Sequence, residues 1–294
     1  MALTDDQVSR TLQHINYPKS KHASDPLQLL RELMLHFVAR VPFETIGLHY
    51  STTHRLSVKQ DDLFEKIVVR SKGGYCVELN NLFALLMRAL GFSVLTVGGR
   101  VRAGQERYTG WSHMCSIVTI DSQRYQVDVG YGADSSFQPI PLQDGYEFTI
   151  FAPRRGKLEY RSIDHHTDPS QRLWVYSMQE DAQSEWKEQY AFVETEFFQG
   201  DYEMTNYFCS TSPDSFFSFT VFAMRAIVEE GQLKGILTLY KDVVRRRVGG
   251  TRETLETLTT EEDRVRALAK YFNMPLTEEE KQGIHSTGLA LGQK

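Results

Sequence analysis

A cysteine that follows two glycines is the strongest chemical signal in the sequence. Cys76 comes after Gly73-Gly74-Tyr75 and directly before an apolar-periodic run, so we expect it to begin a helix. The positive end of a helix and its unpaired N–H groups favour a thiolate over a thiol. We interpret the glycines as clearing space for a substrate. Cys76 is thus a candidate nucleophile, although a single cysteine is more often a buried core residue.

A thiol nucleophile needs a base, and the base needs an orienting group on its other nitrogen. His113 opens one β-rich run and Asp128 closes the next, and we predict that the two runs pair as a hairpin about residues 121–123. This pairing would place His113 and Asp128 nearly opposite each other. Either residue alone reads as an ordinary polar residue at a strand end. Together with Cys76 they predict a Cys-His-Asp triad.

The other reactive side chains give weaker signals. Cys115 and Cys209 are expected to be small buried thiols. The neighbouring His165 and His166 have no partner array at zinc spacing, so we predict no metal site. The sequence also contains no phosphate-binding or dinucleotide-binding glycine motif after a strand.

Composition limits the class of protein. The chain has 294 residues, of which 41% are hydrophobic, 12% aromatic and 24% charged, and this excludes a mostly disordered chain. A net charge of −5 gives no general attraction to nucleic acid or to an anionic membrane. Three scattered cysteines and the absence of a signal-like N-terminus favour a soluble cytoplasmic protein. The apolar run 216–228 is too short to span a bilayer.

Helices are expected first in the chain. Thr4, Asp25 and Asp61 or Asp62 are suitable N-caps for three of them, and a fourth is predicted from Cys76 to a stop at Gly91.

Strands are expected next, at 93–101, 113–120, 125–129, 174–176, 216–227 and 236–240, followed by a helix at 260–272. Residues 153–169 are predicted to be a long connection, and the tail 277–294 a loose or docked extension.

Several motifs occur in an order that resembles a known family. They are Val-Pro-Phe-Glu-Thr (41–45), Lys-Gly-Gly-Tyr-Cys-Val-Glu-Leu-Asn (72–80), Thr-Gly-Trp-Ser-His (109–113), Val-Asp-Val-Gly-Tyr-Gly (127–132) and Asn206 with Ser-Thr-Ser-Pro (210–213). This set, spread over most of the chain, resembles the arylamine N-acetyltransferases. The resemblance implies an α+β fold with a cysteine-protease-like Cys-His-Asp core. Its implied parts are a helical bundle (1–91), a β-barrel (92–205) and an α/β lid with the tail (206–294).

The same resemblance implies an activity. Members transfer an acyl group from coenzyme A, through a cysteine thioester, to arylamines, arylhydrazines or N-hydroxyarylamines. It therefore implies that Cys76, His113 and Asp128 are catalytic, with acetyl-CoA as the expected co-substrate and malonyl-CoA or another acyl-CoA as the alternative. We expect a monomer with no permanently bound cofactor, no metal, and no nucleic-acid or membrane partner.

Binding residues are also implied by the resemblance. Those expected to contact coenzyme A are Thr109, Gly110, Phe208, Ser212 and Asp214, and the basic run 245–247 could meet its phosphates. Those expected to shape the acceptor pocket are Phe43, Tyr131, Ala133 and Ser135.

Three positions depart from the family pattern. Lys72 stands where an arginine is usual, and we expect it to pair with Glu44 without the bidentate geometry of arginine. Thr45 replaces a usual asparagine, and Phe208 lacks the hydroxyl of a tyrosine found in some relatives.

Two rival functions remain at this stage. The same triad serves a cysteine hydrolase if water replaces the amine. A non-enzymatic module that binds coenzyme A or an aromatic ligand would leave Cys76 inert.

Overall fold

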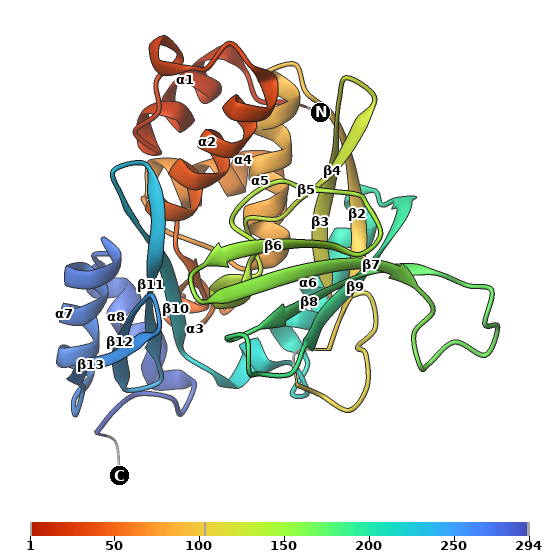
Figure 1. Cartoon of the computed structure of the whole chain (residues 1–294). Coiled ribbons are helices and arrows are strands. Elements are labelled where there is room, and N and C mark those ends of the chain that lie inside the picture. The colour runs from red at the N-terminus through yellow and green to blue at the C-terminus, as the bar shows by residue number, and fades with distance from the viewer. Residues whose placement is uncertain (1, 103, 293–294) are drawn as a thin grey trace.

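The computed structural model describes residues 2–102 and 104–292 and has the predicted α+β architecture (Figure 1). Helices of the N-terminal part lie beside a strongly curved eight-stranded sheet, and a second, five-stranded sheet carries the C-terminal helices. The division into three domains at residues 91 and 205 stays a prediction. In the described part of the chain, no helix is both long enough and apolar enough to cross a membrane.

The N-terminal helices follow their capping signals. Thr4 and Asp25 cap the first two long helices through their side chains, as predicted. The third begins at Gln60 with Lys59 as its N-cap and continues as a π-helical turn, so the prediction that Asp61 or Asp62 caps it is wrong. The elements are α1 (Asp5–His14), η1 (Lys19–Lys21), α2 (Pro26–Arg40), α3 (Ile46–His49), α4 (Gln60–Phe64), η2 (Glu65–Val69) and α5 (Cys76–Ala89).

Helix α5 is the centre of the core. Every residue from Cys76 to Met87 is buried, which requires neighbours on all sides of the helix. Its apolar side chains pack against α1, α2 and the sheet in one continuous cluster. The chain leaves α5 at Gly91, whose φ of +91° suits glycine, as the predicted stop requires.

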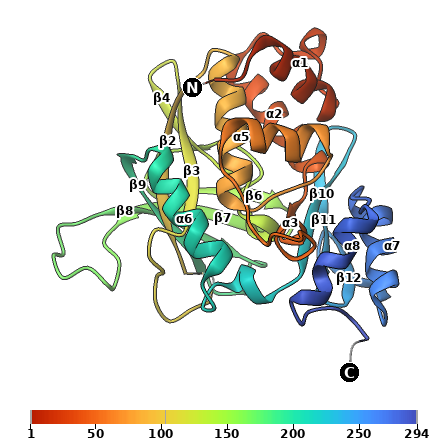
Figure 2. The same cartoon turned by 180° about the vertical axis from the view of Figure 1, so that it is seen from behind.

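The eight-stranded sheet is antiparallel in the order β5-β4-β3-β2-β9-β8-β7-β6. Figure 2 shows α6 (Gln199–Thr211) running along this sheet next to α5. The strands are β2 (Ser93–Val101), β3 (His113–Ile120), β4 (Gln123–Val127), β5 (Ile140–Pro141), β6 (Tyr146–Phe151), β7 (Arg154–Arg161), β8 (Leu173–Gln179) and β9 (Lys187–Glu196), with the short helix η3 (Gly132–Asp134) between β4 and β5.

The expected long connection at 153–169 is wrong, because its first half forms β7. Arg155, Lys157 and Glu159 alternate with buried residues at 154, 156 and 158, so most of the polar composition belongs to one face of a strand rather than to a loop.

The predicted register of the β3–β4 hairpin is also wrong by two residues. The turn contains only Asp121 and Ser122, both at positive φ, and Ile120 pairs with Gln123. The pairing ends at Ser116 and Val127, so an extended ladder would place position 130, not 128, opposite His113. Asp128 therefore lies just beyond β4, in the segment that leads to η3.

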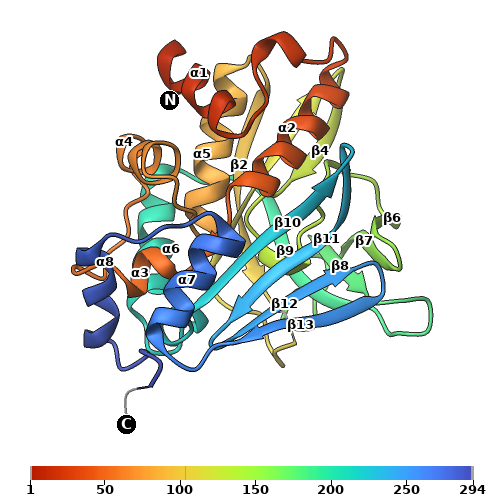
Figure 3. The same cartoon turned by 90° about the vertical axis from the view of Figure 1, so that its left-hand side faces the viewer.

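The C-terminal part builds the second sheet, in the order β1-β10-β11-β12-β13 (Figure 3). The expected strand at 216–227 begins only at Phe222, because 216–219 form a 3-10 turn. The remaining elements are β1 (Phe43–Glu44), η4 (Phe216–Phe219), β10 (Phe222–Glu229), β11 (Gln232–Tyr240), β12 (Val243–Val248), β13 (Thr251–Thr257), α7 (Glu261–Phe272), α8 (Glu278–Gly283) and η5 (Ile284–Ser286).

The tail is a docked extension as far as it is described. Leu289 and Leu291 pack against the core formed by α7 and this sheet. Residues 293–294 lie outside the described part of the chain.

Candidate active site

Cys76 is the first residue of α5 and is 3% exposed. Its thiol donates a hydrogen bond to the carbonyl oxygen of Ser112, at 3.6 Å.

The two preceding glycines do not line the cavity in front of Cys76. A Cβ at Gly73 would lie 2.0 Å from the Pro42 carbonyl oxygen, so the glycine permits close backbone packing. The interpretation that these glycines clear space for a substrate is wrong.

His113 and Asp128 form a buried pair. His113 Nε2 lies 2.7 Å from Asp128 Oδ2, and both side chains are at most 1% exposed. The other carboxylate oxygen of Asp128 accepts hydrogen bonds from the Asn80 side chain at 2.9 Å and from Gly130 N at 2.8 Å. The structure thus brings together the three predicted residues despite the wrong register.

Asn80 is a site residue that sequence reasoning missed. Its amide also donates to the Met114 carbonyl at 2.6 Å, and its oxygen accepts from Val129 N at 2.9 Å. Asn80 therefore ties α5 to β3 and to the segment that carries Asp128. The available signal was its position four residues after Cys76, one helical turn further along the same face.

The buried charges on this pair depend on each other. Burial alone would lower the pKa of His113, but the charge and hydrogen bond of Asp128 outweigh it and raise this pKa to about 10. Burial would raise the pKa of Asp128, and His113 reverses that effect, so the pKa is lowered. The imidazolium and the carboxylate therefore form one charged unit at neutral pH.

Two opposing effects act on the nucleophile. The pKa of the Cys76 thiol is raised overall, because burial raises it more than the hydrogen bond and charge of His113 lower it. The N-terminal end of α5 adds to the second effect. Ionisation of Cys76 thus depends on a protonated His113.

Two tyrosines pack against the imidazole of His113. The ring of Tyr131 meets it edge-on at 5.1 Å between centroids, and the ring of Tyr190 lies at 4.6 Å. Tyr131 donates its hydroxyl to the Gln189 carbonyl at 2.7 Å, and Tyr190 accepts a hydrogen bond from Gln126. Tyr190 comes from β9, and no motif in the sequence pointed to it.

A cavity of about 590 Å³ opens in front of Cys76 and His113. Seven of the nine predicted binding residues line it, namely Thr109, Gly110, Phe208, Asp214, Phe43, Tyr131 and Ala133. Ser135 does not, because it is buried and its hydroxyl accepts from Tyr131 N. Ser212 does not either, because it caps the end of α6, where its hydroxyl accepts from Asp214 N.

The C-terminal part closes the cavity with aromatic side chains that the sequence did not assign, namely Phe216, Phe217, Phe222 and Tyr240. Phe43 packs edge-on against two of them, Phe217 and Phe222, which fixes one wall. Among the described residues that line the cavity, none is a lysine or an arginine, and Asp134 and Asp214 contribute carboxylates.

The predicted ion pair between Lys72 and Glu44 is wrong. Lys66 lies between the two buried carboxylates instead, 2.7 Å from Glu78 and 3.5 Å from Glu44. Lys72 turns to α8, where it contacts Glu280 at 2.9 Å. Lys66, which lies in the π-helical turn η2, thus occupies the place expected for Lys72.

The remaining cysteines and the basic run 245–247 differ in their position relative to the cavity. All three cysteines are free and buried, as expected. Cys209 also lines the cavity, and its sulfur lies 3.7 Å from the same Ser112 carbonyl that Cys76 contacts. The run 245–247 lies on β12, away from the cavity lining, and Arg247 pairs with Glu180. Within the described ranges, no cluster of three or more His, Cys, Asp or Glu side chains could hold a metal ion.

A buried Cys-His-Asp group beneath an aromatic-lined cavity, in an α+β fold, defines a class of thiol-dependent enzymes that includes acyltransferases and hydrolases. Comparison with known proteins shows to which family the chain belongs. A family model described as N-acetyltransferase matches residues 26–281. The chain belongs to the arylamine N-acetyltransferase family and is an acyltransferase of that family.

Similar sequences carry two different names. The chain is 37% identical to N-malonyltransferase FDB2 of Fusarium pseudograminearum (strain CS3096), in an alignment that covers 96% of this chain and 85% of the relative. It is 31% identical to human arylamine N-acetyltransferase 1 over 47% of this chain and 48% of that protein.

Solved structures agree with the fold. The arylamine N-acetyltransferase of Mycobacterium abscessus superposes with a TM-score of 0.81 at 22% identity, covering 97% of this chain and 94% of that one. The enzyme from Nocardia farcinica gives a TM-score of 0.79 at 26% identity, covering 94% and 92%.

Proposed function

We propose that the protein is an acyl-CoA-dependent arylamine N-acyltransferase that works through a thioester on Cys76. The observation that carries this proposal is the joint placement of Cys76 and the His113–Asp128 pair at one cavity with aromatic walls. An aromatic amine fits such walls, and a thiol nucleophile fits transfer of an acyl group from a thioester donor.

The proposed reaction has two halves. In the first, the Cys76 thiolate attacks the carbonyl carbon of the donor, the carbon–sulfur bond to coenzyme A breaks, and the coenzyme A sulfur takes the proton of His113. In the second, the amine nitrogen attacks the Cys76 thioester while neutral His113 accepts the amine proton. The amide leaves, and Cys76 and His113 regain their charges. Asp128 holds the imidazole and stabilises its protonated form throughout.

The tetrahedral oxyanion needs hydrogen-bond donors beside the nucleophile. Cys76 occupies the first position of α5, where backbone N–H groups point out of the helix without an intrahelical acceptor. We propose that these groups serve as the oxyanion site.

For the donor we propose malonyl-CoA, because relatives that are 37% identical over 96% and 88% of this chain are named N-malonyltransferases. Acetyl-CoA is the second candidate. The observation that favours it is the cavity lining, which offers carboxylates but no described lysine or arginine to a malonyl carboxylate. Of the side chains that line the cavity, His113 has its pKa raised and carries a positive charge at neutral pH.

A donor panel tests the proposal. The purified protein is mixed with malonyl-CoA or acetyl-CoA without an amine, and intact-protein mass spectrometry identifies the group added to Cys76. We expect the malonyl adduct to form faster. Faster acetylation would transfer the assignment to the second candidate, and no adduct from either donor would refute the thioester mechanism.

The rival functions give different outcomes in the same system. A hydrolase would release the acyl group to water as fast as to an added arylamine, whereas the proposed enzyme should need the amine. An inert binding module would leave Cys76 unmodified. We further propose that the protein acts as a cytoplasmic monomer, which sedimentation of the purified chain tests for the oligomeric state.

A further inference from the structure

Among the described residues of the connection between β2 and β3, Gln105, Thr109 and Gly110 line one wall of the cavity, while 104–107 are exposed. Thr109 is attached to β2, because its backbone N donates to the Val101 carbonyl and its hydroxyl accepts from Val101 N, both at 2.9 Å. The exposed stretch packs little against the core, so its place depends on the residues that flank it. The ends of this stretch are held at Arg102 and Tyr108.

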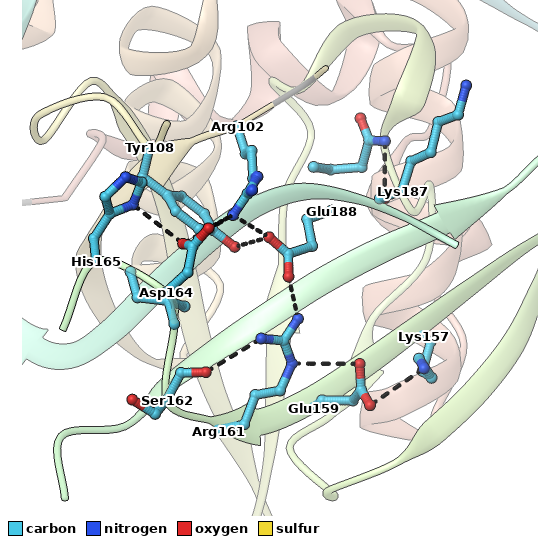
Figure 4. A network of polar contacts seen from close by, with 12 residues as sticks. Arg102, Tyr108, Lys157, Glu159, Arg161, Ser162, Asp164, His165, Lys187 and Glu188 are labelled. Carbon is cyan, nitrogen blue, oxygen red and sulfur yellow. Dashed lines mark hydrogen bonds and ion pairs between the residues drawn. The ribbon is translucent and has the colours of Figure 1, made fainter. Parts of the chain in front are cut away.

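A single carboxylate on β9 holds both ends. Glu188 Oε2 accepts the Tyr108 hydroxyl at 2.7 Å and lies 3.0 Å from Arg102 Nη1 (Figure 4). The Arg102 guanidinium also lies over the Tyr108 ring, 5.2 Å from its centroid. The second oxygen of Glu188 accepts from Arg161 of β7. The side chain of Glu188 thus attaches residues on both sides of the exposed stretch to the sheet.

The same point of β9 holds an aromatic side chain of the site. The carbonyl of Gln189, the next residue, accepts both Arg102 N at 2.8 Å and the Tyr131 hydroxyl at 2.7 Å. Tyr131 lines the cavity and meets His113 edge-on. The backbone of β9 at Gln189 therefore holds Tyr131 without the side chain of Glu188.

The electrostatics favour a charged Glu188. Burial would raise the pKa of its carboxyl, but the hydrogen bonds from Arg161 and Tyr108 and the nearby charges lower it. The side chains of Glu188 and Arg102 are each 24% exposed, so solvent and salt screen this contact less than a fully exposed pair. Asp164, the other carboxylate on Arg102, is 54% exposed and does not reach Tyr108 in the contacts described.

We propose that Glu188 is a positioning residue for the acyl donor, acting through Arg102 and Tyr108. This inference rests on the proposed function. Gln105 is both exposed and part of the cavity lining, so the cavity meets solvent at this wall. A donor as long as an acyl-CoA must extend through this opening, whereas a short arylamine fits within a cavity of this size. Loss of the attachment should therefore weaken use of the donor more than use of the acceptor.

The test is Glu188→Gln, which keeps the size of the side chain and removes its charge. Replacing charge-assisted hydrogen bonds with neutral ones should raise KM for the donor about tenfold, while kcat and KM for the amine stay within about twofold. Glu159→Gln is the matched control, because Glu159 pairs with Arg161 and Lys157 in the same network but touches neither end of the wall. It should leave KM for the donor within about twofold.

A second variant keeps the test informative if Glu188→Gln folds poorly. Tyr108→Phe removes only the hydroxyl and should raise KM for the donor in the same direction. In the double variant the donor KM should rise by less than the two single effects combined, because both substitutions remove the same contact between Tyr108 and Glu188.

Equal donor KM values for Glu188→Gln and Glu159→Gln, or a loss of kcat without a change in donor KM, would overturn the positioning role. Acylation of wild-type Cys76 is measured in parallel. Its absence refutes the proposed function, whereas normal acylation with an unaffected Glu188→Gln variant refutes only this inference.

Discussion

Replacing Asp128 with asparagine should change the pH range in which His113 is protonated. The carboxylate charge holds the pKa of His113 at about 10 against the opposing effect of burial. At pH 8 a group with that pKa is protonated by about 100 to 1. Without the charge, burial lowers the pKa of His113, and the hydrogen bond and charge of Cys76 remain to oppose burial. At the ordinary pKa of 6.5, roughly 3% of the imidazole would be protonated at pH 8.

The acylation rate should follow this difference. The proposed first half-reaction requires a protonated His113, so Asp128→Asn should lower the rate at pH 8 by up to about 30-fold through protonation alone. Loss of the orienting bond from Asp128 to the imidazole adds to the deficit, giving roughly 10²- to 10⁴-fold in total. The rate is measured as single-turnover acylation of Cys76 between pH 6 and 10, with circular dichroism to check the fold.

The shape of the profile separates the two contributions. For the wild type the rate should persist until pH approaches 10, and for Asp128→Asn it should already fall above about pH 6.5. A variant whose rate still falls only near pH 10 would show that Asp128 does not control the charge of His113. The reasoning about the buried pair would then be wrong, whatever the size of the rate loss.

Three further changes have defined outcomes. Cys76→Ala should remove the acyl adduct seen by mass spectrometry and lower transfer by several orders of magnitude, and turnover within about tenfold of wild type would contradict the thioester. Ala133→Phe should slow transfer to bulky arylamines in the second half-reaction but leave acylation by the donor nearly unchanged; equal slowing of both would remove Ala133 from the acceptor wall. Lys66→Met should lower the free energy of unfolding by about 3–5 kcal/mol in urea titrations, because it leaves two buried carboxylates without their cation. Lys72→Met, whose partner lies on α8, is the control, and a loss equal to that of Lys66→Met would refute the assignment.

Much of the fold could be predicted because helix caps, helix stops and strand periodicity depend only on short stretches of sequence. Thr4 and Asp25 cap their helices, Gly91 ends α5, and β2 and β3 have the predicted bounds. The prediction of a connection at 153–169 was wrong because it relied on polar composition and not on the alternation of exposed and buried residues. Of the charged residues in β7, Arg155, Lys157, Glu159 and Arg161 lie on one face, whereas Arg154 is buried on the other face with Gly156 and Leu158.

The candidate site could be predicted only where motif residues carry the chemistry themselves. Cys76, His113 and Asp128 were found in this way, although the assumed register was wrong, because Asp128 reaches His113 from beyond the end of β4. Asn80 and Tyr190 were missed because their roles depend on which elements pack together. Such long-range contacts leave no pattern in a single sequence.

The same reasoning explains why the cavity needs the whole chain. Its nucleophile begins a buried helix, its imidazole opens a strand of one sheet, and its closing aromatic side chains belong to the C-terminal part. The Phe43 segment, β1, pairs with β10 and thereby joins the nucleophile's part of the chain to the second sheet. Separation of that sheet would remove Phe222 and Tyr240 from the cavity and admit water to Cys76 and His113. Because a buried charge pair is stronger when water is excluded, we expect the C-terminal part to be required for an activated Cys76 and not only for binding substrates.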